Sequence, residues 1–544
     1  MGSSENWTSF VTDFEESYFK ANPSFAVFQG RHEFDGKLPD WTAVGIKKWV
    51  AELRTWRDKA TAFDASSLDD KQKFEREYLV AVANRDLFWL DTADWPFKNP
   101  RYYADSLDPN VYVAREYAPP AERLKAYTAY ARAVPVAVEQ IKANLRTPLP
   151  RPYLDIGKLT FGGFADYYQK DVPGIFSSVS DPALQADFRA ANEAAIRAMR
   201  DMDKWLDSQR PKATEAFAMG ADLFSKMLKE TELVDVSLDE LERVGRADLE
   251  RNVEALRKAC AEYAPGKTIL ECINKASAIK PEGGTVEAAR RQLDELKAFV
   301  AEKQVVTIPG PEQARVEESP PYQRYNFAYI DIPGPYEKGL PSIYYVAPPD
   351  PSWSKAEQLA YIPGRSDLLF TSVHEVWPGH FLQFLHSNRS HSKFGEIFVG
   401  YAFAEGWAHY AEEMMWDSGL GNGDPETHIG QLQNALLRNA RYLSAIGLHA
   451  RGMTTQASER LFREETYQDS ATARQQAARG TFDPAYLNYT LGKLMIRKLR
   501  DDWTASRGGK AGWKQFHDAF LSYGGPPVPL VRKAMMGTDA GPLF

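Results

Sequence analysis

Apolar residues recur with helical periodicity through the first 305 residues of the chain. Near the N-terminus they fall at three- and four-residue steps, as on one face of an α-helix, at Trp7, Phe10, Val11, Phe14 and Tyr18. Comparable stripes occur at 43–62, 68–92, 121–145, 183–208, 213–230, 238–262 and 285–303. We therefore expect residues 1–305 to form an N-terminal helical scaffold.

The pattern changes at 306–363, where proline and tyrosine are dense. Tyr325, Phe327 and Tyr329 alternate as in a β-strand, and residues 343–346 form a second candidate strand. Helical stripes return at 367–386, 395–417, 427–450, 455–466, 484–504 and 511–522. The prediction is a mainly α, two-lobed fold in which a small sheet at 306–363 precedes a second helical region at 364–544.

The composition of the chain argues against several classes of function. With 544 residues, 44% of them hydrophobic, the chain has ample material for a core, and its net charge of -8 without long basic runs argues against nucleic acid or a membrane surface as partner. No run of about 18 uncharged apolar residues predicts a spanning helix. The N-terminus lacks signal-peptide features, so the chain as it stands is expected to be cytoplasmic, or periplasmic or secreted if a signal segment has been removed. Cys260 and Cys272 are expected to be two buried thiols.

Histidines are concentrated in one part of the chain, because seven of the nine lie between residues 374 and 449. His374, Glu375 and His380 resemble a zincin arrangement, in which two histidines hold zinc and a glutamate activates water. Six residues correspond to about 600° of rotation, so an unbroken helix would point the histidines to different faces. A break at Pro378-Gly379 would bring them together. The alternative is a helix that ends at Trp377 and leaves a surface histidine.

A third ligand is expected from the helix around residue 405. Glu405, His409 and Glu412 follow one another at i, i+4 and i+7 in an otherwise apolar stretch, and buried carboxylates and imidazoles need a metal or one another. Glu405 is predicted to bind the metal, while His409 and Glu412 support the ligands or face the substrate. In the alternative, this polar stripe faces water. Trp407 and Tyr410 are expected in the core.

Four segments carry a resemblance to a known family. Residues 374–383 resemble the HExxPGHHxQ signature of the domain-of-unknown-function family 885, a group of suspected zinc peptidases. Residues 405–408 are similar to its EGWAxYAE segment, 438–449 to RxxR…GxH and 489–493 to YxxG(K/R), and weaker likeness elsewhere extends over most of the chain. The chain departs from the family at Phe381, where a second histidine is usual, and at 483–489, which meets PGQAxSY only loosely.

The resemblance implies a helical fold with a deep cleft, similar to helical zinc carboxypeptidases and oligopeptidases. It also implies one Zn²⁺ per chain, bound by His374, His380 and Glu405, with Glu375 as the general base.

Further groups would complete such a site. An oxyanion needs a donor besides the metal, for which Tyr489 and His449 are candidates, each with a structural role as the alternative. A terminal carboxylate of the substrate needs a cation, which Arg438 and Arg441, or Lys493 and Arg497, could supply. The remaining histidines are expected at the surface: His32, His386, His391, His428 and His517.

The leading hypothesis is a zinc-dependent hydrolase of peptide amide bonds, acting as a carboxypeptidase or dipeptidase on short peptides. A zinc enzyme acting on a small-molecule amide or an amino-acid conjugate is the second hypothesis, and an inactive binding protein is the third. No nucleic-acid or membrane partner is expected, and a homodimer stays open.

Overall fold

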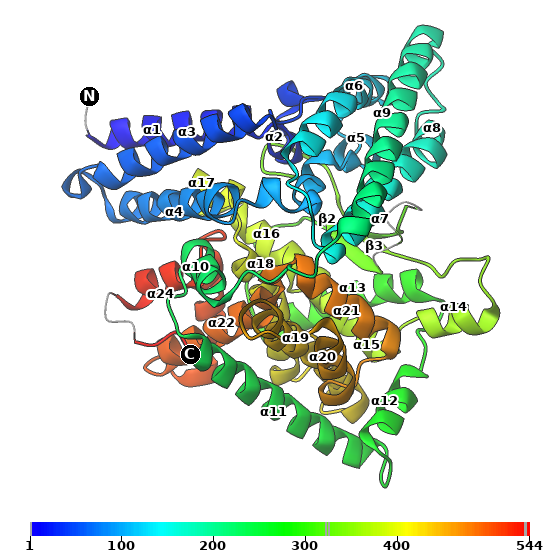
Figure 1. Cartoon of the computed structure of the whole chain (residues 1–544). Coiled ribbons are helices and arrows are strands. Elements are labelled where there is room, and N and C mark those ends of the chain that lie inside the picture. Colours follow the sequence, from blue (N-terminus) through cyan, green and yellow to red (C-terminus); the bar gives the residue numbers. More distant parts are fainter. Residues whose placement is uncertain (1–2, 321–323, 325–326, 538–540) are drawn as a thin grey trace. The chain divides into compact units, whose positions relative to one another are not determined.

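The computed structural model describes residues 3–320, 324, 327–537 and 541–544, and it consists mainly of α-helices with one three-stranded sheet in this described part (Figure 1). The predicted fold class is thereby confirmed. The chain divides into two compact units, unit 1 of Met1–Phe217 with Pro333–Leu340 and unit 2 of Ala218–Ile332 with Pro341–Phe544. The region boundaries expected from sequence, at 305 and 363, both fall within unit 2. The expected cleft stays a prediction.

Unit 1 is helical, and its helix α9 packs against both α6 and α7. The helices of this unit are α1 (Ser3–Ala21), α2 (Pro23–Phe28), α3 (Ala43–Ala62), α4 (Asp70–Leu87), α5 (Asn110–Ala114), α6 (Pro120–Asn144), α7 (Arg151–Lys170), α8 (Val172–Ile175) and α9 (Pro182–Gln209). The sequence did not predict α7, whose three glycines weaken its helical signal. One of them, Gly157, lies where a Cβ would come within 2.9 Å of Leu206 on α9, so close packing explains it.

Unit 2 contains the sheet and a second set of helices. The longer helices are α10 (Ala221–Glu232), α11 (Leu238–Tyr263), α12 (Ile269–Ser277), α13 (Thr285–Lys303), α15 (Arg365–Glu375), α16 (His380–Ser387), α18 (Tyr401–Asp417), α19 (Pro425–Ala450), α21 (Ser470–Phe482), α22 (Asn488–Thr504), α23 (Trp513–Leu521) and α24 (Val528–Met536). The shorter ones are α14 (Lys355–Tyr361), α17 (Lys393–Ile397) and α20 (Thr455–Arg460). Two pairs, α18 with α22 and α11 with α19, pack extensively.

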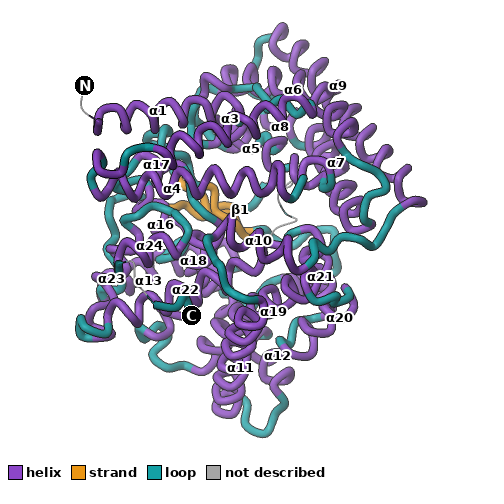
Figure 2. The backbone as a smooth tube through the Cα atoms, turned by 60° about the vertical axis from the view of Figure 1, so that its left-hand side comes forward, coloured by secondary structure: helices purple, strands orange, loops and turns teal. Residues whose placement is uncertain are grey.

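The sheet has the order β1-β3-β2 and is the orange element in Figure 2. Strand β1 (Ala314–Glu318) runs parallel to β3 (Ser342–Val346), and β2 (Ala328–Asp331) runs antiparallel to it. Strands β2 and β3 confirm the two candidate strands, whereas β1 was not predicted. Of the alternating aromatics, Tyr329 lies in β2, Phe327 directly precedes it, and Tyr325 is outside the described residues.

The expectation of two buried thiols is wrong, because Cys260 and Cys272 form a disulfide. The first cysteine lies near the end of α11 and the second lies within α12. The chain reverses between the two helices, where Gly266 has a φ of +77° that only glycine adopts readily. That reversal brings the two Cα atoms to 5.7 Å. The spacing of the two cysteines in the sequence could not predict this disulfide.

The crossing of α18 and α22 depends on two glycines. A Cβ at Gly406 would lie 2.5 Å from the Cα of Gly492, and a Cβ at Gly492 would collide with the carbonyl oxygen of Ala402. Only glycine at both positions lets the helix backbones approach this closely. Because Gly406 directly follows Glu405, this crossing also fixes the position of the third expected metal ligand.

We predict that Gly492→Ala lowers the free energy of unfolding by about 1–3 kcal/mol, because the added methyl group overpacks the crossing. The matched control is Gly163→Ala in α7, where no atom lies within 4 Å of the added Cβ. That control should leave stability unchanged or raise it by up to about 1 kcal/mol. Urea unfolding of both variants measures the difference, and equal stability of the two would contradict the role of the crossing.

Candidate metal centre

A helix break brings the two histidines of the motif together. Helix α15 ends at Glu375, and α16 begins at His380 after a short non-helical connection. Gly379 lies against the end of α15, where a Cβ would collide with the carbonyl oxygen of His374. The indole Nε1 of Trp407 donates to the carbonyl oxygen of Pro378 at 2.8 Å and so joins the break to α18. The break expected at Pro378-Gly379 is therefore present.

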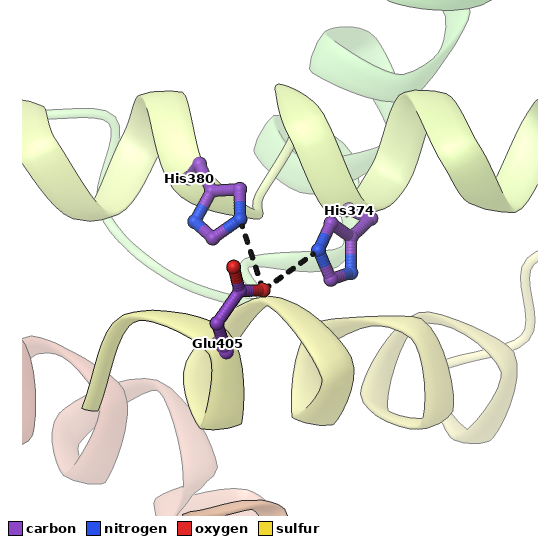
Figure 3. A group of neighbouring side chains, drawn as sticks. All are labelled: His374, His380 and Glu405. Atoms are coloured by element: carbon purple, nitrogen blue, oxygen red, sulfur yellow. Dashed lines mark hydrogen bonds and ion pairs between the residues drawn. The ribbon is translucent and has the colours of Figure 1, made fainter. Parts of the chain in front are cut away.

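Three potential ligand atoms converge at this break. Glu405 Oε2 lies 3.2 Å from His374 Nε2 and 3.4 Å from His380 Nε2, as the dashed lines in Figure 3 show. All three ligand atoms lie within 4.8 Å of one another. The side chains of His380 and Glu405 retain 13% and 21% of their exposure, so the cluster has an open side. Two imidazoles and one carboxylate with an open position are typical of a catalytic zinc site.

A buried carboxylate orients the first histidine. His374 Nδ1 lies 2.7 Å from Glu412 Oε1, and Glu412 is fully buried. Burial alone would lower the pKa of His374, but its hydrogen bonds to Glu405 and Glu412 outweigh that effect and raise the pKa to about 9. Because Nδ1 is bound to Glu412, Nε2 is the nitrogen that is left to bind a metal cation instead of a proton.

His409 and Arg438 surround the same carboxylate. His409 Nδ1 lies 3.4 Å from Glu412 Oε2, and burial followed by the charge of Lys493 lowers the pKa of His409 to about 4. Arg438 Nη2 lies 3.5 Å from Glu412 Oε1. The pKa of Glu412 is depressed, since Arg438 and the two histidines outweigh the effect of its burial. His409 is fully buried and belongs behind the ligands, not at a substrate-facing position.

Glu375 and Tyr489 lie next to the ligands. Burial raises the pKa of Glu375, while the charges of His374 and His380 act against that rise. The ring of Tyr489 stacks near that of His374, with centroids 6.3 Å apart. Burial and the nearby charge of Glu405 raise the pKa of Tyr489, so its hydroxyl keeps its proton at neutral pH. Both residues lie at the cluster, and their roles as base and donor stay predictions.

Two predicted site residues lie in other surroundings. His449 donates from Nε2 to the carbonyl oxygen of Gly480 at 2.7 Å and stacks on Phe224, so its ring serves the packing of α19 instead of the cluster. Lys493 binds Asp248 at 2.8 Å and Glu413 at 3.4 Å in the interior, which commits its charge to two carboxylates of the protein. The predicted roles of His449 as an oxyanion donor and of Lys493 as a substrate-binding cation therefore do not fit these surroundings.

Arg441, in contrast, lies over the Tyr489 ring, with its Cζ 4.9 Å from the ring centroid. Arg479 and Tyr401 also lie next to this ring but were not predicted, because neither belongs to the segments that carry the family signature. Among the remaining histidines, His391 is exposed as expected. His517 is fully buried and contacts Tyr410 and the carbonyl oxygen of Val305, so its expected surface position is wrong.

The fold and the two-histidine, one-carboxylate cluster define a mainly helical protein with a potential metal centre. The chain belongs to the family described as "Bacterial protein of unknown function (DUF885)", which matches residues 23–535. The family resemblance is thus confirmed. No curated protein matches the chain.

Two solved structures share the fold. One is described as a "putative lipoprotein of unknown function" from Shewanella oneidensis, with a TM-score of 0.81, 24% identity, and coverage of 97% of this chain and 99% of that one. The other, a "putative lipoprotein" from Colwellia psychrerythraea, has a TM-score of 0.83, 17% identity, and coverage of 98% of each chain. No described helix is both long and apolar enough to cross a membrane.

We predict that Glu412→Gln weakens zinc binding by about 10- to 100-fold, because His374 loses the carboxylate that fixes its tautomer and orientation. Competition with a chromogenic chelator measures the affinity. The control Glu295→Gln removes an exposed carboxylate from α13 and should leave the affinity unchanged. Equal zinc affinity in both variants would contradict the orienting role of Glu412.

Proposed function

We propose that this protein is a zinc-dependent hydrolase of peptide or peptide-like amide bonds. The observation that carries the proposal is the convergence of His374 Nε2, His380 Nε2 and a Glu405 oxygen, with His374 Nδ1 held by Glu412. This donor set fits zinc, because neutral imidazole and carboxylate are its usual ligands and a supporting carboxylate commonly orients a ligating histidine.

The residues around the cluster supply the other parts of such a reaction. A bound zinc ion would polarise the scissile carbonyl and lower the pKa of a water molecule. Glu375 would accept a proton from the attacking water and deliver it to the leaving amine. The hydroxyl of Tyr489 donates a hydrogen bond to the oxyanion. Glu412 and Arg438 lie behind His374 and keep its ring in place.

We predict that Glu375→Gln retains one equivalent of zinc while kcat falls by about 100- to 10,000-fold, because the variant lacks the proton acceptor but keeps the ligands. Metal analysis and assays on a library of short peptides check both parts. Removal of zinc with a chelator should abolish hydrolysis, and added zinc should restore it. Full activity of the variant, or of the metal-free protein, would overturn the mechanism.

We also propose an extracytoplasmic location, which replaces the cytoplasmic expectation. Two observations support it: the disulfide between Cys260 and Cys272, a bond that persists in oxidising compartments, and the description of both related structures as lipoproteins.

We predict that both cysteines resist alkylation when cells that naturally make the protein are treated with a thiol reagent before lysis. After reduction both should become labelled, as peptide mass spectrometry would detect. Labelling of both cysteines before reduction would contradict the proposed location.

A further inference from the structure

Three arginines surround the ring of Tyr489 next to the metal cluster. The Cζ atoms of Arg438, Arg441 and Arg479 lie 5.8, 4.9 and 5.9 Å from the ring centroid. The first two arginines come from α19, and the third comes from α21. The same ring stacks near His374, and Arg438 Nη2 itself lies 3.4 Å from His374 Nδ1.

Both terminal nitrogens of Arg438 are engaged within the described part of the protein, while its Nε is buried there without a hydrogen-bond partner. Its Nη1 donates to Asn434 Oδ1 at 2.7 Å and to the Asn434 carbonyl oxygen at 3.1 Å, while its Nη2 faces Glu412. Asn434 is itself held, since its amide donates to Asp367 Oδ1 at 2.8 Å. Arg438 therefore positions Glu412 and has little capacity left for a substrate.

Arg479 is only partly engaged. It forms an ion pair with Asp483 at 2.9 Å, and its Nη2 also donates to the hydroxyl of Tyr401 at 3.1 Å. Its side chain keeps 30% of its exposure, in contrast to the buried side chain of Arg438.

Arg441 has no carboxylate partner in the described part of the chain. Its Nε donates to Gln476 Oε1 at 2.8 Å, and no carboxylate oxygen of a described residue lies within 4.0 Å of its guanidinium nitrogens. Only 8% of Arg441 is exposed. Burial, and then the charge of Arg479, lower the pKa of Arg441 to about 10, so it stays charged at neutral pH. A buried cation without a counter-ion is costly, and an anion supplied by a ligand would offset that cost.

We propose that Arg441 and Arg479 form the subsite for a carboxylate on the leaving-amine side of the substrate, with Tyr401 beside them. This inference rests on the proposed function and deepens it, because it makes the enzyme a carboxypeptidase that releases one C-terminal amino acid. In such a substrate, the scissile carbonyl carbon and the carboxylate of the C-terminal residue lie about 4 Å apart. The Tyr489 ring lies next to both His374 and Arg441, with centroid distances of 6.3 Å to the His374 ring and 4.9 Å to Arg441 Cζ. Arginine also matches a carboxylate with two parallel hydrogen bonds.

The test compares three substrates of the zinc-loaded protein: benzoylglycyl-phenylalanine, its C-terminal amide, and benzoylglycyl-glutamic acid α-amide. The wild type should hydrolyse the acid with a kcat/KM about 30- to 1,000-fold above that for the phenylalanine amide. Arg441→Gln should lose that preference, because its kcat/KM for the acid should fall while its kcat/KM for the amide stays within about threefold of the wild-type value. Activity on the glutamic acid α-amide that depends on Arg441 would assign the subsite to a side-chain carboxylate instead of the α-carboxylate.

Two further variants control for the case that Arg441→Gln does not fold. Arg479→Gln should reduce the preference for the acid in the same direction, while the exposed Arg474→Gln, on the same helix, should not change it. If Arg441→Gln fails to fold, an unchanged preference in Arg479→Gln would overturn the subsite.

A binding measurement separates the subsite from the chemistry. Calorimetry on the metal-free protein should detect N-acetyl-phenylalanine but not its amide, and Arg441→Gln should abolish that binding. Equal hydrolysis of acid and amide by the wild type would overturn the subsite and leave the hydrolase intact. Hydrolysis of neither, with the carboxylate still bound through Arg441, would overturn the hydrolase and leave the subsite intact.

Discussion

The hydrogen bond between His374 Nδ1 and Glu412 is the contact on which the candidate centre depends. It commits one nitrogen of the ring to a buried carboxylate and turns the other toward Glu405 and His380. A carboxylate without exposure stays ionised only with a cation beside it, and Arg438 lies 3.5 Å from Glu412, while His374 and His409 add hydrogen bonds. Arg438 is in turn held by Asn434. A series of polar contacts therefore runs from His374 through Glu412 on α18 to Arg438 and Asn434 on α19.

A second ionic group fixes the helices that carry these residues. Asp248 on α11 accepts hydrogen bonds from Lys493 and Arg497 on α22 and from Asn439 on α19. Glu413 on α18 joins the same cations. Buried ion pairs of this kind contribute less to stability than to a single arrangement of the elements they connect. Here they connect the helices that supply Glu405, Arg441 and Tyr489.

The sequence predicted that His374, His380 and Glu405 come together, because this cluster follows from local rules. His374 and His380 need a helix break, and Pro378-Gly379 supplies one where the spacing requires it. Glu405 could be found because a carboxylate in an apolar helix needs a partner. The arginine subsite could be predicted only in part, since Arg479 reaches Tyr489 from a different helix. His449 and Lys493 were misplaced because helical spacing gives the direction of a side chain but not which partner is nearest. The fold class followed from periodicity, whereas α7 depends on a tertiary contact at Gly157 that no local pattern contains.

The connection between β2 and β3 has a consequence for how the protein can be dissected. Pro333–Leu340 belongs to unit 1, where Glu337 is almost fully buried and pairs with Arg115 at 2.9 Å. Neither unit is a continuous stretch of chain, so no single cut in the gene separates them. A fragment that begins at Ala218 would carry Glu337 without Arg115, so this carboxylate would lose the partner with which it is buried in the whole chain. Expression of the metal centre by itself therefore requires a short linker in place of residues 333–340.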